Sequence, residues 1–141
     1  MSPEINPKYL NIIIELFNQK GIFSFSTQGK YKYKVPYFCI KSKQSEVYFL
    51  KLVKRELGIK SKIYTYSGSI GKDGYFRSGF CMLITRDIGE LKDSIIPFSA
   101  KYLTGDKLQK FKDWIKNMKK LDMVPSGHRQ IPGIVKAIIS V

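Results

Sequence analysis

The segment "PKYLNIIIELFNQKGIFSFSTQ", residues 7–28, decides the fold because its hydrophobic period changes once, at Gly21. Its first half carries apolar residues at helical spacing: Leu10, Ile13, Ile14 and Phe17. After the glycine the period becomes two, so that Phe23 and Phe25 share one face of a strand. Asn6 is suited to cap the helix, because a proline follows it in the first turn. We therefore predict a helix over 7–19 that ends at a sharp corner and leads into a half-buried strand.

The remaining sequence repeats this succession of helix and paired strands. Further elements are predicted in chain order: a strand at 31–43, a helix at 45–57, strands at 62–69 and 75–85, a short helix at 89–96, a long helix at 104–121 and terminal helical turns at 131–139. Ser45 is expected to cap the second helix, Gly58 to end it, and Pro97 to end the short one.

The predicted order αββαββα indicates an α+β fold. Two hairpins would form one four-stranded antiparallel sheet with helices on one face, leaving the other face uncovered. Residues 1–141 are expected to form one domain, with a core at about 7–121 and a helical tail at 122–141.

Strand alternation predicts which side chains lie on the uncovered face. Those expected there are Ser24, Ser26, Gln28, Val35, Tyr37, Cys39, Lys41, Lys62, Tyr64, Tyr66, Tyr75 and Arg77. In the last strand the same count sets Phe76, Phe80, Met82 and Ile84 opposite to this face, toward the helices. Lysine, amide, hydroxyl and tyrosine side chains together suit phosphates and bases, so this face is the predicted binding surface.

Charge indicates the class of partner. The chain has 25 basic and 11 acidic residues, a net charge of +14, which makes a polyanion the expected ligand. Of the basic residues 21 are lysine, a point charge suited to phosphate, whereas arginine is the better reader of guanine. We therefore expect nucleic acid held mainly by its backbone. No apolar stretch approaches the roughly 20 residues that cross a bilayer, and no membrane partner is expected.

Other candidate chemistry has simpler explanations. Cys39 and Cys81 lie in separate apolar runs and are expected to be reduced thiols. His128 is the only histidine and is expected in an exposed loop. The glycines of "GSIGKDG" lack the spacing of a phosphate-binding loop, and Trp114 is expected in the core. We predict no catalytic residue and no metal ligand.

Three segments resemble the LAGLIDADG homing-endonuclease family and its RNA-splicing maturase relatives. They are "YLNIIIELFNQKGIFSFS", "SIIPFSAKYLTGDKLQKFKDWIKNMKKL" and "SGHRQIPGIVKAI". The family signature aligns with residues 13–21, where it ends its helix with an acidic residue that binds Mg²⁺. Here that position is Lys20, whose ammonium has no lone pair to offer a metal. Asn18 and Gln19 provide only neutral oxygens, so the corner is expected to face phosphate directly.

The resemblance also bears on assembly. The family has small residues where this chain has Ile14 and Glu15, and the small residues let two signature helices pack closely. A buried glutamate without a partner is costly, which argues against a symmetric homodimer.

Together these features predict a catalytically inactive protein of the LAGLIDADG fold that binds structured RNA without a cofactor. Ribosomal RNA of an organellar ribosome, with other ribonucleoprotein components as partners, and intron RNA both fit. The chain is rich in lysine, isoleucine, tyrosine and phenylalanine, as coding in an A+T-rich genome would produce, and this bias favours a mitochondrial location. The predicted binding residues are Lys20, Ser24, Ser26, Gln28, Lys30, Lys32, Tyr37, Lys41, Lys62, Tyr64, Tyr66 and Arg77. One alternative is an active homing endonuclease that cuts double-stranded DNA with Mg²⁺, and a second is a phage or plasmid DNA-binding regulator.

Overall fold

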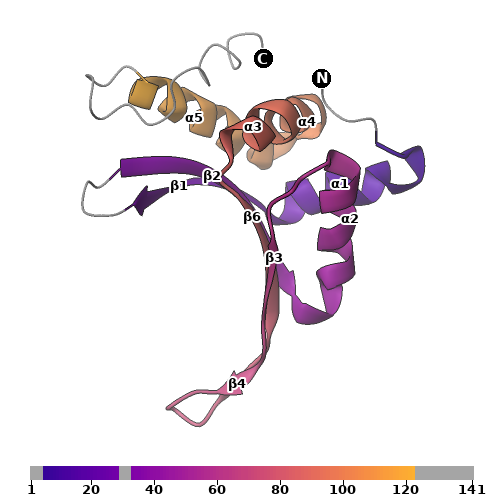
Figure 1. Ribbon diagram of the computed structural model, residues 1–141, viewed down its shortest axis with the longest axis vertical. Helices are drawn as coiled ribbons and strands as arrows, with labels where there is room; N and C mark the ends of the chain where they lie inside the picture. Colours follow the sequence, from indigo (N-terminus) through magenta and orange to yellow (C-terminus); the bar gives the residue numbers. More distant parts are fainter. Residues whose placement is uncertain (1–4, 29–32, 123–141) are drawn as a thin grey trace.

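The computed structural model describes residues 5–28 and 33–122 (Figure 1). Its elements, in chain order, are α1 (Pro7–Lys20), β1 (Gly21–Gln28), β2 (Tyr33–Lys43), the 3₁₀ turn η1 (Gln44–Glu46), α2 (Val47–Leu57), β3 (Ile63–Tyr66), β4 (Ser69–Ile70), β5 (Phe76–Arg77), β6 (Phe80–Thr85), α3 (Ile88–Glu90), the π-helical turn η2 (Leu91–Ile95), α4 (Ile96–Tyr102) and α5 (Gly105–Asp122). Lys30, Lys32, His128 and the predicted terminal turns lie outside the described residues.

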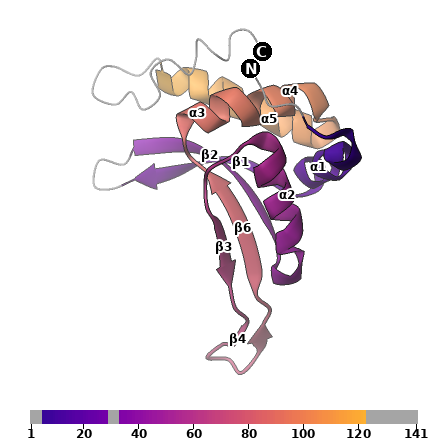
Figure 2. The same ribbon diagram turned by 45° about the vertical axis from the view of Figure 1, so that its right-hand side comes forward.

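Four strands form one antiparallel sheet in the order β1-β2-β6-β3. The helices lie on one side of this sheet, which curves away from them and leaves its concave face uncovered (Figures 1 and 2). The predicted α+β architecture is therefore confirmed. β4 and β5 form a separate two-stranded sheet that extends the β3–β6 pair outward. Within the described ranges, no helix combines the length and apolar character needed to cross a membrane.

The corner that begins the fold forms as predicted. The Asn6 side chain caps α1 by accepting a hydrogen bond from the backbone N–H of Lys8, at 3.0 Å. The helix ends at Lys20, and β1 starts at Gly21 with no loop between them. A Cβ at Gly21 would lie 2.6 Å from the carbonyl oxygen of Phe17. The corner therefore requires glycine for space, since its backbone is ordinarily extended.

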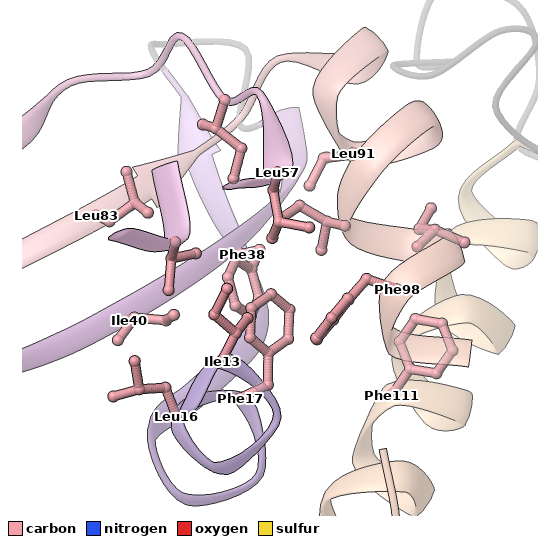
Figure 3. Close-up of a cluster of buried hydrophobic side chains, with 14 of the residues drawn as sticks. Ile13, Leu16, Phe17, Phe38, Ile40, Leu57, Leu83, Leu91, Phe98 and Phe111 are labelled. Carbon is pink, nitrogen blue, oxygen red and sulfur yellow. The ribbon is translucent and has the colours of Figure 1, made fainter. Parts of the chain in front are cut away.

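An aromatic cluster joins the helices to the sheet. Phe17 of α1 stacks on Phe38 of β2 with ring centres 4.7 Å apart, and the Phe98 ring of α4 lies 4.5 Å away (Figure 3). Trp114 of α5 is buried as expected, and its indole N–H donates to the Ser24 carbonyl at 2.9 Å. Close packing of such rings fixes the helical layer on the sheet.

The phase of β6, meaning which of its side chains face the helices and which lie on the open face, differs from the prediction. The register pairs Leu83 with Ile40 and Cys81 with Ser42, so these residues face the helices and are buried. Phe80, Met82 and Ile84 lie on the open face instead. Alternation counted from Tyr75 and Arg77 failed because β5 belongs to the separate hairpin, and residues 78–79 interrupt the strand before β6 begins.

Two helix boundaries also differ from the prediction. Pro97 does not end the helix: it occupies the first turn of α4, directly after the π-helical turn η2. There the Ile96 N–H reaches back five residues to the Leu91 carbonyl, and a first-turn position tolerates the missing proline N–H. Ser45 lies within η1, and no side chain caps α2. Gly58 does end α2, in the left-handed conformation with φ of 67°.

Candidate nucleic-acid interface

The register of the sheet brings polar and aromatic side chains from four strands onto one concave face. Ser24 of β1 stands opposite Tyr37 of β2, and Lys41 of β2 stands opposite Met82 of β6. On the far side of β6, Met82 is paired with Tyr64 and Phe80 with Tyr66. The face therefore carries a row of rings and methionine bordered by cations.

Two cations lie over aromatic rings of this face. Lys41 Nζ is 4.2 Å from the centre of the Phe80 ring, which stacks on Tyr66 with centres 4.5 Å apart. Arg86, just after β6, places its guanidinium 5.6 Å from the centre of the Tyr37 ring. Such contacts hold each charge beside a flat apolar surface. Strand alternation predicted the two tyrosines and Lys41 but missed Phe80 and Arg86, which depend on the phase and end of β6.

Tyr64 and Tyr66 retain 45% and 43% exposure, so both rings are accessible. Exposed rings beside ammonium groups can stack with bases while the cations contact phosphates. Among the other predicted residues, Tyr37, Ser24 and Ser26 lie half-buried in the strands. The Ser26 hydroxyl is buried and finds no hydrogen-bond partner among the described atoms. Gln28 is the last residue of β1, and its side chain lies outside the description.

Arg77 and Lys62 occupy different places from those predicted. Arg77 belongs to the β4–β5 hairpin, where its guanidinium donates to Asp73 at 2.8 Å. Lys62 precedes β3 by one residue and lines a groove shared with α2. The structure thus divides the predicted surface into a central face, a protruding hairpin and a groove at the β3 edge.

The β4–β5 hairpin projects from the end of the sheet (Figure 2). It exposes three large apolar side chains. Ile70, Tyr75 and Phe76 are 73%, 74% and 69% exposed. The prediction placed Tyr75 on the binding face and set Phe76 opposite to it, whereas both are open to solvent. Apolar surface this exposed beside charged residues is typical of a contact site.

Lys20, at the end of α1, forms a network that joins α1, β2 and η1. Its ammonium donates to Ser42 Oγ at 2.8 Å and to Glu46 Oε1 at 3.2 Å, and the Ser42 hydroxyl donates to the same carboxylate oxygen at 2.9 Å. The Ser42 hydrogen bond, followed by that of Lys20, lowers the pKa of Glu46. The Lys20 charge is therefore matched by a carboxylate, and the lysine does not stand at the corner as an unpaired cation.

The residues around this corner do not fit a divalent metal. The Asn18 amide donates to the Ile14 carbonyl at 3.0 Å and accepts from the Thr104 N–H at 3.1 Å. The Gln19 amide donates to Glu15 at 3.0 Å. Mg²⁺ requires several oxygen ligands in near-octahedral arrangement. Asn18 Oδ1 and Glu46 Oε1 already accept hydrogen bonds, and the Lys20 ammonium would repel the ion.

Both cysteines are free, and both are buried, although Cys39 was expected on the uncovered face. On the open face, Cys39 of β2 stands between its strand partners Ile22 of β1 and Ile84 of β6. Burial raises the pKa of the Cys39 thiol to about 11, although the Lys41 and Arg86 charges act in the opposite direction. Cys39 is therefore a packing residue of the face.

No family model matches the chain, and no curated protein matches it. Solved structures do match. The LAGLIDADG homing endonuclease I-GzeII in complex with a DNA target gives a TM-score of 0.61 at 22% identity, covering 94% of this chain and 44% of that one. I-SmaMI, bound to cleaved DNA, gives 0.62 at 19% identity, with coverages of 99% and 44%. The homing endonuclease I-TnaI gives 0.59 at 14% identity, with coverages of 96% and 99%.

These likenesses define the fold: the chain has the LAGLIDADG homing-endonuclease-like fold, as the resemblance implied. It spans slightly less than half the length of the I-GzeII and I-SmaMI chains and nearly all of the I-TnaI chain.

Proposed function

We propose that this protein binds nucleic acid on its concave sheet face and does not cleave it. The observation that carries the proposal is the arrangement of Lys41, Phe80 and Tyr66, in which an ammonium lies over one ring and that ring stacks on another. Tyr64 adds another ring on β3, and Arg86 adds a second cation over a ring, that of Tyr37. DNA bound to I-GzeII and I-SmaMI supports a nucleic acid as the ligand class for this fold.

The proposed absence of cleavage rests on the corner at Lys20. We take Lys20 to occupy the position of the acidic metal ligand of the signature. Its ion pair with Glu46 supports a structural role for this corner, because the pair ties the end of α1 to η1. An active endonuclease is the second candidate, favoured by the structural likeness to the homing endonucleases I-GzeII and I-SmaMI.

We further propose structured RNA with unpaired bases as the ligand, of the ribosomal or intron type. Exposed tyrosines favour unstacked bases, which structured RNA presents in loops and bulges. The preponderance of lysine over arginine favours contact with the backbone over reading of the major groove.

A binding assay with three labelled ligands tests the proposal: a stem–loop RNA, a single-stranded RNA and a DNA duplex, all at one salt concentration. We expect the stem–loop to bind most tightly, and Tyr66→Ala to weaken it about tenfold through the loss of one stacked base. Lys116→Ala on α5, an exposed lysine, is the control and should bind as the wild type does. Equal binding by Tyr66→Ala would contradict the assignment of the face.

Incubation with Mg²⁺ separates the two candidate functions. The proposal predicts that all three ligands stay intact on a denaturing gel. Cleavage of the duplex that requires the metal would overturn the inactivity while leaving the binding face in place. Preference for the duplex without cleavage would instead favour a DNA-binding role.

A further inference from the structure

A second basic surface lies outside the concave face, between the end of α2 and the start of β3. It is an open groove of about 740 Å³. Among the described residues, its lining includes five cations and no carboxylate: Lys51, Lys54, Arg55, Lys60 and Lys62. Arg55 is engaged with Glu56 and lies over the Tyr9 ring. The four lysines form no salt bridge within the described ranges.

The chain reversal at Gly58 creates this charge cluster. Gly58 adopts a left-handed conformation and ends α2, and the Ile59 N–H then bonds back to the Lys54 carbonyl at 2.9 Å. Ile59 is buried in the core, which fixes the turn against the domain. The reversal thereby brings Lys60 and Lys62 beside the lysines of α2, at a cost in mutual repulsion.

Cations at a helix C-terminus also have a structural explanation, because they favour the negative end of the helix dipole. This effect is confined to the last turn and covers Lys54 and Arg55. Lys51 lies a turn earlier, and Lys60 and Lys62 lie beyond the helix. The nearby Glu90 carboxylate accepts from the Lys60 N–H, the Ser61 N–H and the Ser61 hydroxyl, so it fixes the backbone of the turn. Helix capping therefore leaves most of the cluster unexplained.

We propose that this groove binds the sugar–phosphate backbone of the nucleic acid whose bases contact the concave face. The inference rests on the proposed function and extends it to a second contact. β3 is the edge strand of the sheet, and it links the two surfaces: Lys62 lines the groove one residue before β3, and Tyr64 and Tyr66 of β3 lie on the face. A nucleic-acid strand that leaves Tyr64 and Tyr66 and crosses this edge of the sheet enters the groove.

The side chains of the groove identify the part of the ligand that it holds. Lysines supply point charges suited to phosphate, and the part of the chain that the structure describes places no aromatic residue in the groove to stack on a base. Lys51 and Lys54 lie about one helical turn apart along α2, and Lys60 and Lys62 line the same groove beyond the end of the helix. An extended polyanion satisfies this arrangement better than a single phosphate.

The test compares two triple variants that remove the same charge. One is Lys51→Ala, Lys54→Ala, Lys60→Ala in the groove; the other is Lys112→Ala, Lys116→Ala, Lys119→Ala on α5, where all three lysines are exposed. Affinity is measured for single-stranded RNA oligomers of increasing length, and the salt dependence is measured for the longest. Thermal unfolding verifies that both variants fold.

We expect the variants to diverge only for long oligomers. The groove variant should bind short RNA as the wild type does but gain no further affinity with length, and its log–log salt slope should fall by about 2, for three phosphate contacts at about 0.7 each. The α5 variant should keep the wild-type gain with length. An unchanged slope in the groove variant, or an equal loss in the α5 variant, overturns the inference.

Two further outcomes keep this inference apart from the proposed function. If wild-type protein binds no RNA or DNA of any length, the proposed function fails and the groove assignment fails with it. If RNA binds and Tyr66→Ala weakens it, while the groove variant behaves as the wild type, only the groove assignment fails. Polyglutamate of matched charge serves as a competitor: displacement of long RNA as effective as that by unlabelled RNA would assign the groove to acidic protein segments instead.

Discussion

At the scale of single residues, Gly21 shows how one missing side chain shapes the fold. The end of α1 and the start of β1 approach so closely that a methyl group would meet the Phe17 carbonyl at 2.6 Å and the Phe38 ring at 3.2 Å. Backbone and packed aromatic atoms cannot move aside cheaply. α1, which ends at Lys20, and β1, the first strand of the concave face, are therefore joined by one rigid corner.

We predict that Gly21→Ala lowers the free energy of unfolding by about 2 kcal/mol, within the range of overpacked sites. Gly89→Ala is the matched control, because its new methyl group would meet one side-chain atom, Asp87 Oδ1 at 3.1 Å, and no backbone or ring atom. Urea unfolding measures both. A loss below about 0.5 kcal/mol in Gly21→Ala would show that the corner can relax.

Glu46 makes stability depend on pH. Because the pKa of its carboxyl is lowered in the folded protein, the unfolded chain takes up the proton first as the pH falls. The stabilisation is therefore fully present above the ordinary carboxyl pKa of about 4 and is lost as the pH falls through the lowered value.

We expect Glu46→Gln to be less stable than the wild type at pH 7, with the difference shrinking as the pH falls toward about 3. The physical reason is that the amide keeps a hydrogen-bond acceptor for Lys20 and Ser42 but carries no charge. Urea unfolding across this pH range gives the free energy of unfolding of each protein as a function of pH. Curves that stay parallel would mean that the network contributes no pH-dependent stability.

At the scale of elements, the β4–β5 hairpin carries side chains that we expect to contribute to binding but not to the stability of the fold. Ile70 and Tyr75 are mostly exposed, so their removal takes little apolar contact from the core. We predict that the double variant Ile70→Ser, Tyr75→Ser changes the free energy of unfolding by less than about 0.5 kcal/mol. Its affinity for the stem–loop RNA should fall several-fold, because the projecting apolar surface serves contact.

Anisotropy titration and thermal unfolding measure the two effects in the same preparation. The double variant Lys112→Ala, Lys116→Ala on α5 controls for a general change of surface. Unchanged affinity in the hairpin variant would leave its exposed side chains without a role in binding.

Hydrophobic period predicted those elements whose two faces differ in polarity. α1, β1 and α5 have one apolar stripe each, and their bounds were close to those observed. In β6 the run "FCMLIT" offers no polar face, so its phase is set by pairing with β2, as in the match of Leu83 with Ile40. Pro97 broke a local rule because a π-helical turn precedes it. The phase of β6 thus depends on a strand distant in sequence, whereas the place of Pro97 depends on the turn directly before it.

The candidate site was predictable to the same degree. Tyr64, Tyr66 and Lys41 follow from alternation within clearly phased strands. Phe80 depends on the phase of β6. The pairing of Lys20 with Glu46 joins residues 26 positions apart, and only the folded chain brings α1 beside η1. Sequence reasoning identified the cation at the corner but not the carboxylate that neutralises it.

At the scale of the whole molecule, part of the excess behind the net charge of +14 lies on two surfaces that meet at β3. Lys41 and Arg86 lie over rings of the concave face, and the lysine cluster lines the groove between α2 and β3. Because α1 and α2 cover the other side of the sheet, the route from face to groove passes around the β3 edge (Figure 1). Ionic strength therefore reports on both surfaces at once.

We predict a log–log salt slope of about −4 for wild-type protein and long single-stranded RNA, since six phosphate contacts would each release about 0.7 counterions. A fourfold rise in salt should then weaken binding by about 250-fold. Lys41→Ala and Arg86→Ala together should reduce the slope by about 1.4 for RNA of every length, whereas the groove variant reduces it for long RNA alone. A slope near −1 for the wild type would mean that most of the excess charge makes no contact with phosphate, and binding would then have to arise from the aromatic rings.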